Sequence, residues 1–168
     1  NEVYFTDARI PHDELVKLFE GYGHRVHVVA GDEPAAVHRL LADTQRICEA
    51  EMNLWHGKPS RGGGRATPLP FKRYVFMLNA VDEGHGGLEH RASTALIAPR
   101  RDLPQRGKAE SGDGYVSLLG LISHEYFHTW NVKRLRPKEF ASYDYTRENY
   151  TELLWFFEGF TSYYDDLV

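Results

Sequence analysis

Two histidines four residues apart, with a glutamate directly after the first, form the part of the sequence best suited to chemistry. Residues four apart lie on one face of an α-helix, so His124 and His128 can present two imidazole nitrogens to one point. Catalytic zinc commonly takes two histidines and a carboxylate and keeps its fourth position for water. Glu125 lies about 100° around the helix from His124. It is therefore predicted to be the general base, beside the metal and not on it.

The surroundings of these residues favour a metal site over two ordinary core histidines. In that alternative both rings would simply be hydrogen-bonded to backbone groups. The flanking segment is apolar enough to be a buried helix, and three ionisable groups within one turn of it would be costly to bury without a shared partner. A metal ion supplies that partner. The apolar residues of this segment are Tyr115, Val116, Leu118, Leu119, Leu121, Ile122, Phe127 and Trp130.

A second apolar segment, residues 151–164, offers the third ligand. Glu158 lies among large apolar residues in it, and a carboxylate in such surroundings is expected to be paired or ligating. Gly159 weakens a helix interior, which suggests that another element approaches closely there. Glu152 is the competing candidate, but it lies near the start of the helix, where a carboxylate usually faces solvent.

These segments together resemble a known family. His124 to Pro137 and Leu154 to Tyr164 are similar to the glycyl aminopeptidase family of gluzincin metallopeptidases, and the resemblance spans roughly residues 24–168. The stretch Glu-Gly-Phe-Thr at 158–161 also resembles a segment of the wider aminopeptidase N group in which the glutamate is the third zinc ligand. The resemblance therefore implies one zinc ion held by His124, His128 and Glu158.

The same resemblance assigns a substrate-binding strand. The stretch Gly86-Gly-Leu-Glu-His90 is similar to the Gly-x-Met-Glu-Asn strand of the wider group, with Leu88 and His90 in place of its Met and Asn. It implies that the backbone at Gly86 and Gly87 holds the peptide and that Glu89 binds its free amino terminus. The residues alone leave two interpretations open, namely an exposed strand edge that pairs with a peptide and an ordinary glycine-containing hairpin.

Composition sets outer limits on function. The chain has 168 residues, 42% of them hydrophobic and 13% aromatic, which suffices for a sizeable core. The net charge of −4 gives no reason to expect nucleic acid or an anionic membrane as a partner. No run approaches the ~20 apolar residues of a membrane span and no signal peptide is expected, while the compartment is left open between cytoplasm and periplasm. The single cysteine, Cys48, is expected to be a small core residue.

The periodicity predicts the elements that must position the site. A helix is expected over Pro11–Glu20, a strand over Arg25–Ala30 and an amphipathic helix over Pro34–Trp55. Strands are expected within Phe71–Val81 and over Leu88–Ala98, then a surface loop over Pro99–Gly114 with Asp113 as a candidate helix cap. The fold class is therefore α+β, with a small mixed or antiparallel sheet packed on helices, resembling the metal-bearing lobe of a thermolysin-like peptidase. Residues 1–168 are expected to form a single such lobe of a longer protein.

The predicted activity is zinc-dependent hydrolysis of peptides at a free amino terminus, and the preference for glycine or alanine comes from the resemblance alone. In the resembled enzymes a second helical lobe supplies the residue that steadies the tetrahedral intermediate, and this residue is expected to lie outside the chain. An endopeptidase and a catalytically silent zinc- or peptide-binding module stay open as alternatives. Asp144 and Glu148 are candidates for orienting a ligand histidine through its second nitrogen.

Overall fold

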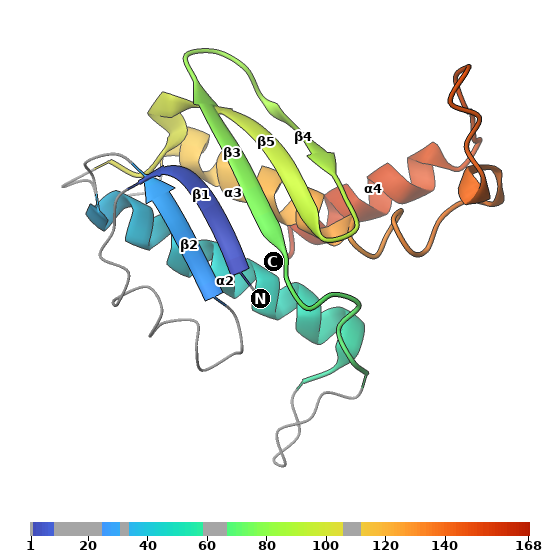
Figure 1. The fold of residues 1–168 in the computed structure, drawn as a ribbon, viewed down its shortest axis with the longest axis horizontal. Coiled ribbons are helices and arrows are strands. Elements are labelled where there is room, and N and C mark those ends of the chain that lie inside the picture. Colours follow the sequence, from blue (N-terminus) through green and yellow to red (C-terminus); the bar gives the residue numbers. More distant parts are fainter. Residues whose placement is uncertain (1, 9–24, 31–33, 59–66, 106–111) are drawn as a thin grey trace.

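A computed structural model describes residues 2–8, 25–30, 34–58, 67–105 and 112–168. Within them the chain forms a three-stranded sheet, a two-stranded sheet and the helices α2, α3 and α4 (Figure 1). The helix expected over Pro11–Glu20 lies outside the described residues. Mixed α+β architecture with a small sheet is therefore confirmed.

The three-stranded sheet has the order β3-β5-β4. Strand β3 (Val75–Val81) runs parallel to β5 (Ser93–Pro99), and β4 (Gly86–Glu89) runs antiparallel to β5, so the sheet is mixed. The single strand expected over Leu88–Ala98 is wrong, because a turn divides it into β4 and β5. The backbone N–H of His90 donates to the carbonyl of Ser93 across this turn, at 2.9 Å.

A second sheet pairs β1 (Glu2–Ala8) with β2 (Arg25–Ala30) in parallel. The strand predicted at Arg25–Ala30 is confirmed with the same bounds. The partner strand β1 was not predicted, because the opening segment lacks a clear alternation of apolar residues.

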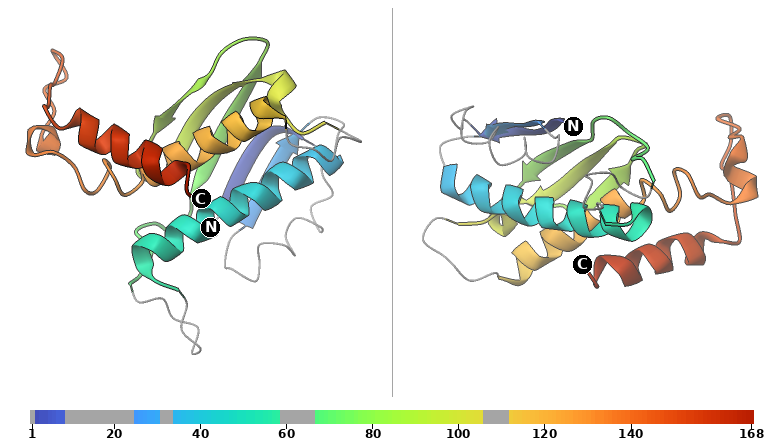
Figure 2. Two further views of the ribbon diagram at one scale, coloured as in Figure 1. Left: turned by 180° about the vertical axis from the view of Figure 1, so that it is seen from behind. Right: turned by 90° about the horizontal axis from the view of Figure 1, so that it is seen from below.

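Helix α3 (Asp113–Phe127) contacts α2 (Pro34–His56), α4 (Leu154–Asp165) and strands β4 and β5. The left view of Figure 2, from the back of the molecule, shows α3 in front of the three-stranded sheet, with α2 and α4 on either side. Helix α2 ends one residue beyond its predicted bound. Gly112, not Asp113, is the N-cap of α3, and no side chain caps that terminus. Short 3-10 helices, η1 (Arg100–Asp102) and η2 (Lys138–Ala141), lie in the connections.

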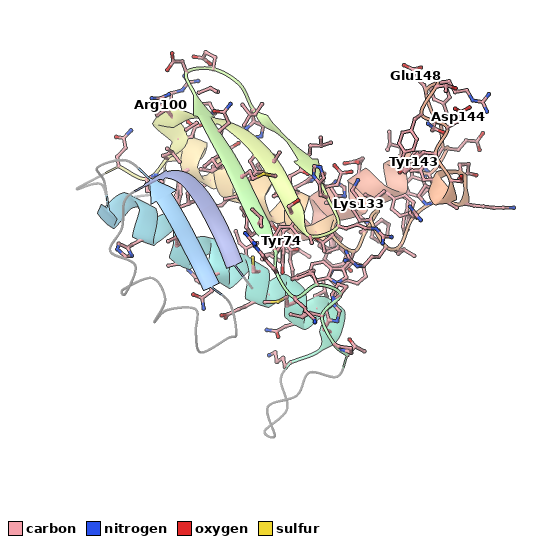
Figure 3. The ribbon with its side chains drawn as sticks, viewed as in Figure 1. Tyr74, Arg100, Lys133, Tyr143, Asp144 and Glu148 are labelled. Carbon is pink, nitrogen blue, oxygen red and sulfur yellow. The ribbon has the colours of Figure 1, made fainter. Side chains whose placement is uncertain are left out.

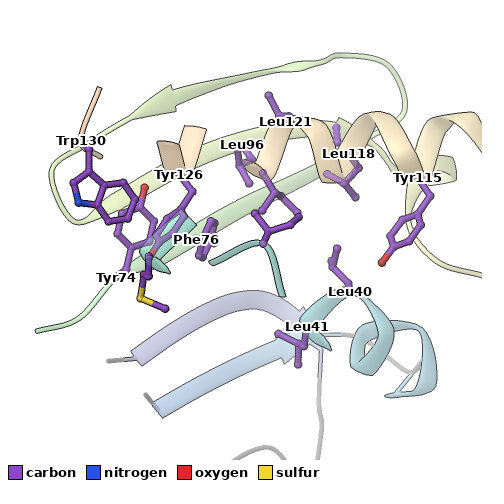
Figure 4. Packing of buried hydrophobic residues seen from close by; sticks show 14 residues of the cluster. Leu40, Leu41, Tyr74, Phe76, Leu96, Tyr115, Leu118, Leu121, Tyr126 and Trp130 are labelled. Atoms are coloured by element: carbon purple, nitrogen blue, oxygen red, sulfur yellow. The ribbon is translucent and has the colours of Figure 1, made fainter. Parts of the chain in front are cut away.

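The hydrophobic core lies between α2, the sheet and α3 (Figure 4). Leu40, Leu41 and Met52 enter it from α2, and Leu96 enters it from β5. Most of the apolar residues of α3 that were predicted to be buried are buried, but Val116 is exposed. Cys48 packs against this cluster, as expected of a small core residue, and burial raises the pKa of its thiol.

No helix among the described residues combines the length and the apolar character that a membrane crossing needs.

Candidate metal and proton-transfer site

The two histidines of the motif meet at the carboxyl end of α3. His128 follows the last helical residue and keeps helical backbone angles, and its N–H donates to the carbonyl of His124 at 3.2 Å. The helical geometry therefore extends through His128, and the two rings lie at 88° to each other with their Nε2 atoms 3.0 Å apart. At least one of these nitrogens must lack a proton for this contact to be a hydrogen bond.

Helix α4 brings a carboxylate to the same point. Oε2 of Glu158 lies 3.2 Å from Nε2 of His124 and 3.4 Å from Nε2 of His128. A tetrahedral zinc ion with ligand distances of ~2.0–2.1 Å requires ligand atoms about 3.3 Å apart. The three atoms, at 3.0, 3.2 and 3.4 Å from one another, already match that spacing. The donor set therefore fits zinc.

Each histidine turns its other nitrogen towards a hydrogen-bond acceptor. Nδ1 of His124 lies 2.7 Å from Oδ2 of Asp165, and Nδ1 of His128 lies 2.9 Å from the carbonyl oxygen of Asn131. Donation from both Nδ1 atoms leaves each Nε2 free to bind a metal. Glu158 and Asp165 are seven residues apart, about two helical turns, so one face of α4 presents both acids.

The expectation that Asp144 or Glu148 orients a ligand histidine is wrong. Asp144 accepts hydrogen bonds from Thr146 in its own turn and pairs with Arg147. Glu148 accepts a hydrogen bond from the Tyr150 hydroxyl. Figure 3 shows both acids in the segment that extends away from the sheet. The spacing from Glu158 to Asp165 was the sequence signal that could have identified the right residue.

Asn131 joins the two elements that carry the candidate metal ligands. Its side-chain nitrogen donates to the carbonyl of Phe157 and to Oγ1 of Thr161, both at 3.1 Å. Asn131 and Thr161 are almost fully buried. These bonds join the turn after His128 to the residues on both sides of Glu158, so they hold the third ligand in place.

The electrostatics of the metal-free cluster favour an ion pair. Burial lowers the pKa of His124, but hydrogen bonds with Asp165 and Glu158 outweigh it and raise the pKa to about 10. Hydrogen bonds with His124 and then His128 hold the pKa of Glu158 well below its usual value. The acid is therefore ionised at neutral pH and available as a metal ligand.

Glu125 lies beneath strand β4. It is buried, and its Oε2 has no hydrogen-bond partner among the described residues. Burial raises the pKa of Glu125; the two histidines lower it, and Glu89 and Glu158 raise it further. A Cβ on Gly87 would stand 2.4 Å from the Glu125 Cδ atom, so only glycine lets the strand lie this close to the carboxylate.

Among the described strands β4 is an edge strand, paired with β5 on one side only. Glu89, at its end, is half-buried, and its Oε1 lies 3.0 Å from Nζ of Lys133. The ion pair with Lys133 was not predicted, because it joins residues 44 positions apart in the chain. A Cβ on Gly86 would meet no atom within 4 Å, but the φ of +152° at this position favours glycine.

Two arguments for Glu158 need correction, although the structure places its side chain with the two histidines. Its side chain is 46% exposed, and its neighbours Leu154, Trp155 and Phe160 are exposed as well. Burial among apolar residues was therefore the wrong reason to select it. A Cβ on Gly159 would meet nothing within 4 Å, so no element in the described part of the chain packs closely against that position. Glu152, the competing candidate, is exposed and precedes α4.

Known proteins resemble this chain in its sequence and its structure. The sequence model of the M61 glycyl aminopeptidase family matches residues 117–168, which hold both histidines, Glu125 and Glu158. A crystal structure of an aminopeptidase N family protein from Idiomarina loihiensis aligns with a TM-score of 0.69 and 44% identity, over 82% of this chain and 22% of that one.

Curated relatives carry the name probable phosphoketolase. The protein from Gloeobacter violaceus is 44% identical over 61 residues, which are 36% of this chain and 8% of that protein. The protein from Chlorobaculum tepidum is 25% identical over 175 residues, covering 81% of this chain and 21% of that protein. The chain thus spans about a fifth or less of the length of these relatives.

Proposed function

We propose that this chain, whose place in the glycyl aminopeptidase family the family match and the solved relative both support, carries the zinc-binding and proton-transfer residues of an aminopeptidase. The family match and the aminopeptidase-like structure support peptidase activity. The zinc dependence and the action at a free amino terminus are the proposal. The phosphoketolase name is not adopted, because those matches are short or only 25% identical.

One observation carries the proposal: three ligand atoms converge at 3.0–3.4 Å beside a buried carboxylate with a free oxygen. His124, His128 and Glu158 would hold the zinc ion. When bound there, zinc lowers the pKa of a coordinated water towards about 7 and polarises a carbonyl group.

The chain's own residues would supply the proton transfers and the positioning. Glu125 would accept a proton from the attacking water through its Oε2 atom and then donate it to the departing amine. Its raised pKa suits this double role, because a carboxyl group that titrates closer to neutrality both accepts and releases the proton more readily. Asp165 would keep the His124 ring oriented throughout.

Substrate binding would use the free edge of β4. An extended peptide can add to such an edge through backbone hydrogen bonds. The backbone at Gly86 and Gly87 would pair with it, which would lay the scissile bond over Glu125, directly beneath Gly87. Glu89, two residues further on, would bind the substrate ammonium and so set the cut one residue from the end.

The test is hydrolysis of glycine and alanine amides by the chain with added zinc, together with metal content. Glu125→Gln is expected to keep zinc and lose the reaction, whereas His124→Ala and Glu158→Ala are expected to lose zinc. Full zinc content in His124→Ala would refute the ligand set. Zinc binding without hydrolysis in the unaltered chain would instead favour a silent binding module.

An endopeptidase is the second candidate, and the ion pair between Glu89 and Lys133 favours it, because that carboxylate already has a cationic partner. Acetylating the substrate amine separates the two. An aminopeptidase is expected to lose most of its turnover when the substrate amine is acetylated. Its Glu89→Gln variant is expected to lose most of its turnover on the peptide with a free amine. An endopeptidase cleaves both peptides alike.

A further inference from the structure

Lys133 forms an ion pair with Glu89, the carboxylate that the proposed function assigns to the substrate's amino terminus. Nζ of Lys133 lies 3.0 Å from Oε1 of Glu89, and their side chains are only 27% and 22% exposed. Exposed ion pairs contribute little, but this pair is largely withdrawn from water, so its charges are less screened. Figure 3 places Lys133 beside the end of β4 and the start of the turn that precedes β5.

The pair lies on the side of β4 that faces α3. Side chains alternate along a strand, so Glu89 projects to the same face as Gly87. Gly87 on that face lies against the Glu125 carboxylate. Leu88, between them, is exposed on the opposite face. The ammonium of Lys133 therefore lies on the face of β4 that is turned towards Glu125, the proposed proton-transfer residue.

The backbone of the Lys133 turn is held in a conformation that places this side chain. Val132 has a φ of +148°, which a β-branched residue rarely adopts. The N–H of Lys133 donates to the carbonyl of His128 at 3.0 Å, and Arg91 donates to the carbonyl of Lys133 at 3.3 Å. The backbone at Lys133 is thus fixed relative to a proposed metal ligand on one side and to the β4–β5 turn on the other, and the ammonium itself is held by Glu89.

We propose that Lys133 is the resident cation of the amine subsite, and that a substrate's amino terminus binds Glu89 by displacing the Lys133 ammonium. The inference rests on the proposed role of Glu89 as the amine anchor. Two ammonium groups on one half-buried carboxylate would leave a positive charge without a partner. Lys133 therefore lowers the affinity of the site for free amines and leaves the affinity for blocked amines unaffected.

The test measures binding of glycinamide, a small free amine, by calorimetry on the whole chain, both with zinc and without it. Lys133→Met removes the charge and keeps most of the stem, and it is expected to bind glycinamide about three- to fivefold more tightly than the unaltered chain, the range of a partly exposed ion pair. Lys133→Arg keeps a cation and is expected to show no such gain. Glu89→Gln is expected to lose binding.

Matched controls exclude general effects. N-acetylglycinamide, which lacks the ammonium, is expected to gain nothing from Lys133→Met. Lys138→Met removes the same charge at an exposed position in η2 and is expected to leave affinity unchanged. A second charge-removing variant, Lys133→Gln, together with circular dichroism, guards against a folding defect in Lys133→Met.

The outcomes separate this inference from the proposed function. The inference is overturned if Lys133→Met and Lys133→Gln are both folded and bind glycinamide no more tightly than the unaltered chain. This holds even if zinc-dependent hydrolysis is present. Tighter binding without any hydrolysis supports the resident cation and counts against the peptidase. In an active chain, Lys133→Met is expected to lower KM for glycine amides about three- to fivefold with little change in kcat.

Discussion

Replacing Gly87 with alanine is expected to disable Glu125, the proposed proton-transfer residue, while leaving the proposed metal site intact. The added Cβ would stand 2.3 Å from the Glu125 Cγ and 2.4 Å from its Cδ and Oε1. An ordinary van der Waals contact begins at 3.4 Å, so the two groups must separate by about 1 Å. Misplacing a catalytic group by ~1 Å can cost about 100-fold in rate.

The expected result is therefore a kcat for glycine amides about 100-fold below that of the unaltered chain. Zinc stoichiometry is expected to stay at its original value, because the ligand atoms come from the end of α3 and from α4 and not from β4. The assay is steady-state hydrolysis with metal content measured on the same sample.

Gly120→Ala is the matched control, since it makes the same change on the helix that carries Glu125. A Cβ there meets nothing within 4 Å, so activity is expected to persist. Alanine also favours a helix over glycine by about 1 kcal/mol, so the melting temperature should not fall. Unaltered kcat in Gly87→Ala, or loss of zinc from it, would refute the placement of β4 over Glu125.

Three further expectations concern the groups around the site. Asp165→Asn removes the anionic acceptor behind His124 and is expected to weaken zinc affinity about 10- to 100-fold in a chelator competition. An unchanged zinc affinity would contradict the orienting role of Asp165. Asn131→Ala leaves the carbonyl of Phe157 without its side-chain donor and is expected to lower the free energy of unfolding by about 1–3 kcal/mol in a denaturant titration. A loss below about 0.5 kcal/mol would contradict the role of Asn131 in joining α3 to α4. Burial raises the pKa of Glu51 well above its ordinary value, so the folded state holds its proton more tightly than the unfolded state does. The stability that this gives is present below the unfolded pKa of ~4.3 and is lost as pH rises towards the folded pKa, so Glu51→Gln is expected to melt higher than the unaltered chain by a margin that grows from about pH 5 to pH 7.

Part of the fold could be predicted from local patterns. The three-four spacing of apolar residues predicted α2 to within one residue, because that period directly reflects the helical repeat. The turn between β4 and β5 was missed, since His90, Arg91 and Ala92 include neither glycine nor proline. A backbone turn held by its own hydrogen bonds needs no such residue.

The sequence alone determined the pair of histidines, because a helix fixes side chains four residues apart on one face wherever it lies. The tertiary structure alone decided which groups surround them. Asp165 behind His124, Lys133 on Glu89 and Gly87 over Glu125 each join elements that are far apart in the chain. Such contacts depend on how helices and strands pack, and no local period encodes the packing. The position of Glu158 likewise depends on contacts between α3 and α4, namely the hydrogen bonds of Asn131 to Phe157 and Thr161 and the stacking of Phe127 on Tyr164.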